Sequence, residues 1–209
     1  MAIIKPFKAL RPTEETAHLV ASVPYDVVNR EEAKMQAEGN PLNFLRITRS
    51  EIELEDSVDA YDPIVYQKAK ENLNKLVDEK KLVLESKPSF YLYRLEMDGR
   101  AQIGITATFA VDDYDNNIIL KHEKTRKVKE DDRTNHIVTT ETQTGVVFLT
   151  YRGVDSVNEV VNSTIAKEKP PYEFTAPDSI KHTIWVVPEK YNEIIEREIK
   201  KVEKLYIAD

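Results

Sequence analysis

The sequence predicts an α+β protein with a mixed, largely antiparallel sheet and flanking helices. In some segments apolar residues recur at helical spacing, and in others they occupy every second position, as they do in half-buried strands. The two kinds of segment alternate without a regular βαβ repeat, and no glycine-rich phosphate fingerprint follows a strand. A doubly wound parallel sheet is therefore the less favoured alternative.

The first forty residues predict a short strand followed by two helices. Residues 3–7 form an apolar run, and Thr13 is positioned as the N-cap of a helix that reaches Ala21. Asn29, with an acidic residue three positions later, predicts a capping box, and Gly39 marks the end of that second helix.

The clearest predicted helix begins after Asp62, an N-cap followed by proline at the first helical position. Apolar residues then follow at helical spacing and predict one buried face: Val65, Ala69, Leu73 and Leu76. Before this helix, residues 43–48 predict a strand, and residues 51–59 an acidic, irregular segment.

A β-hairpin is predicted between residues 91 and 111. Apolar residues alternate along both halves of this segment, and Asp98-Gly99 supplies a two-residue turn of the type that requires positive φ. Residues 116–120 are expected to form a strand that pairs with this hairpin, and residues 145–151 are another apolar run. Further along, the pattern predicts strands at residues 179–187 and 205–208, and helices at residues 154–166 and 189–204.

We expect residues 1–209 to form a single α+β unit. The last predicted strand runs to the end of the sequence, and a domain rarely stops at the tip of an apolar strand. We therefore expect this unit to be the N-terminal part of a longer domain that continues past Asp209.

Composition excludes several classes of protein. Lys and Arg number 30 against 37 for Asp and Glu, a formal net charge of −7, so a broad electrostatic grip on nucleic acid is not expected. The absence of cysteine excludes disulfides and zinc–thiolate sites, and we expect a cytoplasmic protein. No apolar run is long enough to predict a membrane span.

The segment 121–133 concentrates charge and predicts a ligand site. On a helix, the spacing i, i+4, i+7, i+11 would place four basic side chains on one face, where they would bind phosphate: His122, Arg126, Lys129 and Arg133. Asp131 and Asp132 are candidate ligands for Mg²⁺, which prefers one or two carboxylates plus phosphate oxygens. The alternative is a solvated surface on which these acids pair with the neighbouring cations.

A second candidate lies at residues 22–28, where Asp26 is presented beside a proline and is our candidate general base. Its alternative role is to cap a turn. The spacing of His122 and His136 matches no metal motif, and His18 and His182 are expected to be structural. Neither a hydrolase nucleophile elbow nor a P-loop is present in the sequence.

Several motifs, taken together and in order, resemble the bacterial and archaeal family called domain of unknown function 1015. They are Lys5-Pro6-Phe7, Leu10-Arg11-Pro12, Val23-Pro24-Tyr25-Asp26-Val27-Val28, Gly39-Asn40-Pro41, Asn43-Phe44-Leu45, Tyr93-Arg94-Leu95, Lys121-His122-Glu123, Thr125-Arg126, Glu130-Asp131-Asp132-Arg133 and Gln143-Thr144-Gly145. The resemblance spans the whole chain.

This resemblance implies a more distant one, to the ParB and sulfiredoxin superfamily, which includes kinases that phosphorylate free L-serine. It implies ParB/sulfiredoxin-like fold elements and phosphoryl transfer from ATP, ADP or pyrophosphate with Mg²⁺. Sequences of the family that resemble residues 205–209 continue with Gly-His-His-Arg, a box that would grip the phosphates, whereas this sequence ends at Asp209. The chain alone is therefore expected to be inactive, with its own missing C-terminal part as a partner.

The leading hypothesis is the N-terminal portion of a small-molecule phosphotransferase, with Asp26 as the base and a phosphorylated small molecule as its ligand. The first alternative is a non-enzymatic, ParB-like module that binds nucleotide or nucleic acid. The second is a structural remnant, which an exposed apolar patch near Tyr206 and Ile207 would favour. The sequence leaves homo-oligomerisation open.

Overall fold

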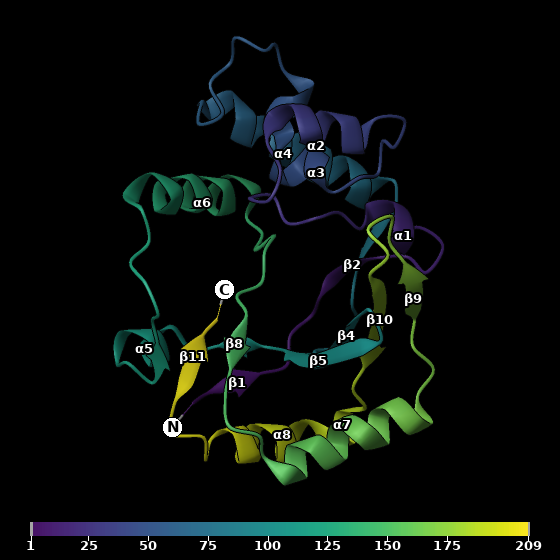
Figure 1. Cartoon of the computed structure of the whole chain (residues 1–209), viewed down its shortest axis with the longest axis vertical. Coiled ribbons are helices and arrows are strands. Elements are labelled where there is room, and N and C mark those ends of the chain that lie inside the picture. Colours follow the sequence, from purple (N-terminus) through teal and green to yellow (C-terminus); the bar gives the residue numbers. More distant parts are fainter. Residues whose placement is uncertain (1, 209) are drawn as a thin grey trace. The chain divides into compact units, whose positions relative to one another are not determined.

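A computed structural model describes residues 2–208 and has the α+β architecture that the sequence predicts (Figure 1). The chain forms two compact units, each built from separate segments. Unit 1 comprises residues 1–10, 84–124 and 147–209, and unit 2 comprises residues 11–83 and 125–146. Because the chain passes between the units four times, neither unit corresponds to one continuous stretch of sequence.

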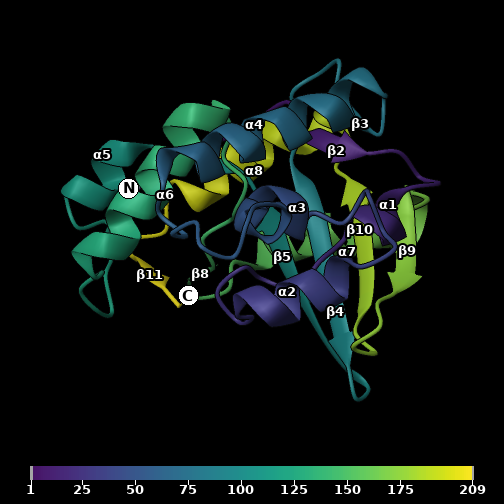
Figure 2. The same ribbon diagram turned by 90° about the horizontal axis from the view of Figure 1, so that it is seen from above.

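Unit 1 is organised around a four-stranded antiparallel sheet in the order β5-β4-β10-β9, and Figure 2 shows these strands side by side. Its strands are β4 (Tyr91–Met97), β5 (Arg100–Thr106), β9 (Tyr172–Thr175) and β10 (Lys181–Val186). The predicted hairpin is confirmed, since Asp98 and Gly99 join β4 to β5 with φ of 51° and 75°.

The remaining elements of unit 1 are short strand pairs and helices. β1 pairs with β6, and β11 lies between β7, to which it is parallel, and β8, to which it is antiparallel. Their bounds are β1 (Ile4–Lys5), β6 (Thr108–Phe109), β7 (Ile119–Leu120), β8 (Leu149–Thr150), β11 (Leu205–Ile207), α5 (Val111–Asp115), α7 (Asp155–Lys167), η2 (Glu189–Tyr191) and α8 (Asn192–Ile199).

The core of unit 1 is apolar. Helices α7 and α8 lie side by side (Figure 1), and their buried residues pack in one cluster with residues of the sheet. Among the residues of that cluster are Phe90, Leu92, Val157, Trp185 and Ile195, all at most 3 % exposed. Leu92 of β4 and Trp185 of β10 are directly paired across the sheet, so their side chains lie on the same face.

Unit 2 is mainly helical. Its elements are β2 (Leu10–Pro12), α1 (Ala17–Val20), α2 (Arg30–Ala37), α3 (Leu45–Thr48), η1 (Ser50–Glu53), α4 (Pro63–Asp78), β3 (Leu82–Leu84) and α6 (Lys127–Thr140). β2 pairs with β3. A small apolar cluster of Val28, Ala33, Ala37, Leu45 and Ile52 joins α2, α3 and η1.

Two helix starts of unit 2 are confirmed in detail. Asn29 accepts from the amide of Glu32, whose side chain in turn accepts from the Asn29 amide, which is a complete capping box. Asp62 caps α4 by accepting from the amide of Ile64, and Pro63 is the first helical residue. Gly39 follows α2 with φ of 68°, as expected after a helix C-cap.

Other local predictions are wrong. Residues 43–48 contain helix α3, because the side chain of Asn43 accepts from the Leu45 amide and starts a turn. Thr13 is not an N-cap, since α1 begins only at Ala17. The return strand of the hairpin does not continue to Val111, where α5 begins, and residues 119–120 pair with β11 instead of the hairpin.

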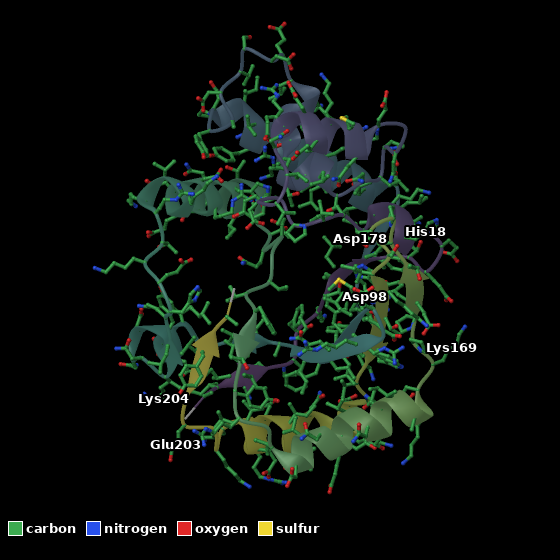
Figure 3. All side chains as sticks on the ribbon, in the orientation of Figure 1. His18, Asp98, Lys169, Asp178, Glu203 and Lys204 are labelled. Carbon is green, nitrogen blue, oxygen red and sulfur yellow. The ribbon has the colours of Figure 1, made fainter. Side chains whose placement is uncertain are left out.

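Two predictions concern histidines outside the charged segment. Figure 3 labels His18, which lies on α1 with an exposed side chain. His182 is half-buried on β10, where its Nδ1 lies 2.7 Å from the hydroxyl of Tyr93. Both positions agree with the secondary structure that the sequence predicts.

Within residues 2–208, no helix combines the length and the apolar character needed to cross a lipid bilayer. Near the C-terminus, Tyr206 is 46 % exposed and Ile207 packs partly against the core of unit 1. The predicted continuation past Asp209 lies outside the described residues.

Candidate functional site

The charged segment divides at the start of helix α6. Arg126 is the N-cap, with extended backbone angles, and the helix begins at Lys127. His122 therefore precedes the helix, and only Lys129 and Arg133 of the four predicted phosphate ligands lie within it. The expected helical face of four basic residues is not formed, because the backbone at Arg126 is not helical. Phosphate binding by the individual side chains stays a prediction.

One face of α6 is both polar and buried, whereas the buried face of a helix is usually apolar. Asp132, His136 and Thr140 follow at intervals of four residues and are 6 %, 2 % and 5 % exposed. Nε2 of His136 lies 3.0 Å from the carbonyl oxygen of Ile47, and the hydroxyl of Thr140 donates to the carbonyl of His136 at 2.7 Å. These hydrogen bonds compensate for most of the cost of burying these groups, while Nδ1 of His136 is buried without a partner among the described residues.

Asp132 uses both of its carboxylate oxygens. The hydroxyl of Tyr66 donates to Oδ1 at 3.1 Å, and Arg133 donates to Oδ2 through Nε at 3.1 Å and through Nη2 at 2.8 Å. A guanidinium that shares two N–H groups with a carboxylate is held in one orientation. Asp132 therefore acts in this structure as a positioning group for Arg133.

The flat face of Arg133 packs on an aromatic ring from the second candidate segment. Its Cζ atom lies 4.0 Å from the ring centroid of Tyr25, a cation–π contact. Tyr25 immediately precedes Asp26, which is exposed in the turn between α1 and α2. Two motifs separated by about a hundred residues in sequence are thus neighbours in unit 2. Lys129 lies farther from a ring, 5.6 Å from the centroid of Tyr61.

Burial and neighbouring charges shift two pKa values in this cluster. Burial, followed by the charge of Asp132 and the hydrogen bond to it, raises the pKa of the Tyr66 phenol to about 12. Burial lowers the pKa of His136, against the raising effect of the Ile47 carbonyl. His136 is therefore neutral at pH 7, with its Nε2–H donating to Ile47, and Tyr66 remains a donor across the physiological range.

The two candidate metal ligands face different partners. Asp131 is exposed and accepts from Lys127, one turn earlier, while Asp132 is buried against Tyr66 and Arg133. Successive residues of a helix point about 100° apart, so the two carboxylates do not converge on one point. Within residues 2–208, no group of three or more His, Asp or Glu side chains suits a metal ion. Mg²⁺ binding by this pair stays a prediction and requires both acids to leave their partners.

Sequence reasoning missed Tyr66 and His136 as members of the cluster. The interval of four residues between Asp132, His136 and Thr140 was a usable signal, because three polar residues on one helical face are out of place in a core. The contribution of Tyr66 had no such signal, since it lies on a different helix, α4.

The fold and the site define an α+β protein whose helical unit holds a buried aspartate–arginine–tyrosine cluster. The chain belongs to the family described as "Protein of unknown function (DUF1015)", whose profile matches residues 4–209. No curated protein and no solved structure matches the chain. The family assignment made from the motifs is confirmed, and the relationship to the ParB and sulfiredoxin superfamily stays a prediction.

Proposed function

We propose that this chain is part of a small-molecule phosphotransferase, distantly similar to the free-serine kinases of the ParB and sulfiredoxin superfamily, and that it acts in the cytoplasm. The observation that carries the proposal is the contact of Arg133 with Tyr25. It brings the candidate phosphate ligand and the candidate base, Asp26, into one neighbourhood of unit 2.

Arg133 is prepared to bind an anion. Asp132 holds one edge of the guanidinium and Tyr25 holds its face, while its side chain keeps 26 % exposure. Among the described residues, Nη1 of Arg133 donates to no acceptor, so that edge is available for a phosphoryl oxygen. Because Asp132 fixes the guanidinium before the ligand arrives, little side-chain entropy is lost on binding.

The start of α6 adds a second attraction for phosphate. Arg126 is the N-cap of α6, and no side chain of the described residues caps this helix start. The amide of Lys129 already donates to the Arg126 carbonyl at 2.9 Å, so a phosphate would meet the amides of Lys127 and Val128. The helix dipole favours an anion at this end. Arg126 and Lys129 are the nearby cations that we assign to the same phosphates.

The proposed reaction transfers a phosphoryl group to the hydroxyl of a small acceptor, with L-serine as the first candidate. The hydroxyl oxygen forms the new bond to phosphorus as the bond between phosphorus and the donor's leaving oxygen breaks, and Asp26 takes the hydroxyl proton. Arg133 and the start of α6 neutralise the charge of the phosphoryl oxygens. ATP, ADP and pyrophosphate are the candidate donors.

A phosphorylation assay tests the proposal. The protein, expressed from its complete gene, is incubated with L-serine and each donor, and phosphoserine is measured by ³¹P NMR. We expect product with at least one donor. Arg133→Met should lower the rate about a hundredfold to a thousandfold, the range seen when one group that stabilises transition-state charge is lost. Arg100→Met, at the exposed first residue of β5, should leave the rate unchanged.

Failure to form product from folded protein with every donor would refute the phosphotransferase. If pyrophosphate still bound and Arg133→Met weakened that binding, the non-enzymatic nucleotide-binding alternative would replace it. A fall in pyrophosphate affinity with increasing salt is expected for either function, so salt dependence does not separate them.

A further inference from the structure

Unit 2 contains a polar pocket on a different face of α4 from Tyr66 and the Asp132 cluster. Its volume is about 540 Å³, within the range of about 300–1,000 Å³ that is typical of small-molecule sites. The loop that follows α2, helix α3, η1 and one face of α4 form its walls. Five charged side chains line it: Arg46, Glu53, Lys68, Glu71 and Lys75.

Arg46 ties the walls of this pocket together. Its Nη2 donates to the carbonyl of Ala37 at 2.7 Å and its Nε to the carbonyl of Asn40 at 2.9 Å, which joins α3 to the end of α2. Its Nη1 donates to Glu53. From α4, the amide of Asn72 donates to the Arg46 carbonyl at 2.7 Å and to Glu53 at 2.9 Å. All four wall elements are therefore cross-linked before any ligand binds.

Glu53, which accepts hydrogen bonds from Arg46 and Asn72 in this network, is ionised. Burial alone would raise the pKa of its carboxyl group, but hydrogen bonds from Arg46 and Asn72, with the nearby charges of Arg46 and Lys68, lower that pKa overall. Glu53 and Arg46 neutralise each other. The charge that a ligand meets is consequently set by the residues of α4.

Two lysines of α4, Lys68 and Lys75, have N–H donors available for a ligand. Nζ of Lys68 lies 3.6 Å from both Glu53 and Glu71, slightly beyond hydrogen-bond distance. Lys75, two turns later on the same face, forms no ion pair with any residue between 2 and 208. Lys68 and Lys75 together outweigh Glu71, so the open side of the pocket carries a net positive charge.

We propose that this pocket binds a small solute through an oxyanion, either a phosphate or a carboxylate group, held by Lys68 and Lys75. The two lysines are i and i+7 on one helix and flank Asn72, which keeps the site polar along its length. The pocket does not involve Arg133 or α6, so this inference is independent of the phosphotransferase proposal.

The test is a titration followed by NMR through the side-chain amides of Asn43 and Asn72, both of which line the pocket. The probes are inorganic phosphate and sodium acetate at constant ionic strength, with sodium chloride as the reference anion. We expect saturable shifts with at least one probe and none with chloride. A preference for phosphate identifies a phosphoryl ligand, and a preference for acetate a carboxylate ligand.

Variants on one helix separate the pocket from general surface charge. Lys68→Gln and Lys75→Gln should each weaken binding about tenfold, because each removes a charge-assisted hydrogen bond. Lys70→Gln is the matched control, since Lys70 lies on the same helix but pairs with Glu141. Glu71→Gln should strengthen binding about two- to fivefold, because it removes the acid that competes for Lys68.

The proposal would be overturned by shifts that do not saturate or that chloride reproduces. It would also be overturned if Lys68→Gln and Lys75→Gln left the shifts unchanged while both variants kept the parent's urea midpoint. Arg133→Met should not affect these shifts. A loss of phosphoserine formation in that variant, with intact binding at Asn72, would therefore separate the two proposals.

Discussion

The two units of this protein differ in how many polar side chains their interiors contain. Unit 1 buries a continuous apolar cluster beneath an antiparallel sheet, with Phe90, Leu92 and Ile195 completely buried. Unit 2 also buries apolar side chains, such as Leu45, Ile47 and Leu73, each at most 4 % exposed. It differs from unit 1 in its larger share of buried polar groups: Thr16, Asn43, Ser50, Glu51, Asp132, His136 and Thr140. In unit 1 the buried polar residues are only Asp113, Thr164, Thr183 and Glu198 within the described chain.

Both sites that we propose lie in the unit with the larger share of buried polar groups. Apolar burial stabilises both units, and in unit 2 specific hydrogen bonds, such as those of Asp132 and Arg46, add fixed orientations to it. Buried polar networks fix side chains in defined orientations, which is what a binding site requires. The cluster of Asp132 and Arg133 and the pocket around Arg46 are two such networks.

The largest expected effect tests the apolar interior of unit 1. Phe90→Ala should lower the free energy of unfolding by about 3–5 kcal/mol, because it leaves a cavity in a fully buried position. The measurement is urea denaturation followed by the fluorescence of Trp185, the single tryptophan of the sequence, which is 3 % exposed in unit 1. As a control, Met97→Ala, at a position that is 56 % exposed, should change stability by less than about 0.5 kcal/mol. Equal effects of the two variants would contradict the assigned core.

The next effect tests the polar interior of unit 2. Asp132→Ala should cost about 2 kcal/mol, less than the ~3–5 kcal/mol of a fully buried pair, because Arg133 retains access to water. Helix content in urea, followed by far-UV circular dichroism, measures this cost. Ultraviolet titration should also show that the pKa of Tyr66 falls from about 12 towards its ordinary value of 10.0.

The adjacent Asp131→Ala is the matched control for this prediction. Asp131 is exposed and forms an i, i+4 pair with Lys127, so its loss should cost about 0.5 kcal/mol or less. An Asp132→Ala variant as stable as Asp131→Ala would show that the buried network does not stabilise unit 2.

A smaller effect is expected at the start of α2. Asn29→Ala removes half of the capping box and should cost about 1 kcal/mol, measured as a shift of the urea midpoint. Asn74→Ala, at an exposed position inside α4, should be neutral or slightly stabilising because alanine is the better helix former. If both substitutions gave the same cost, the cap would have no specific role.

The smallest effect at neutral pH is a titration present in both units. Burial lowers the pKa of His136 in unit 2 and of His182 in unit 1. As pH falls below about 6.5, the unfolded histidines take up protons before the folded ones, so the free energy of unfolding should decrease from pH 7 towards pH 5. His136→Gln should reduce this dependence, and His182→Gln should reduce it separately. An unchanged slope in both variants would exclude the histidines as its cause.

Local signals predicted the elements in which short-range chemistry dominates. The capping box at Asn29, the Pro63 start of α4 and the Asp98-Gly99 turn each depend on atoms within a few residues, and each prediction is confirmed. The run at residues 43–48 failed because a short apolar stretch has no distinguishing period, and the side chain of Asn43 then decided the outcome. The partner of β11 also could not be predicted, since a parallel pair with β7 depends on packing far along the chain.

The sequence by itself determined the α+β class, the family and the charge of the segment 121–133. Only the tertiary structure decided what those charges do. Asp131 and Asp132 are adjacent and chemically identical, yet Asp132 faces Tyr66 of α4 and Asp131 faces solvent. The pairing of Arg133 with Tyr25 and the pocket around Arg46 likewise join residues from different helices. Burial and long-range contacts set these properties, and neither is a function of local sequence spacing.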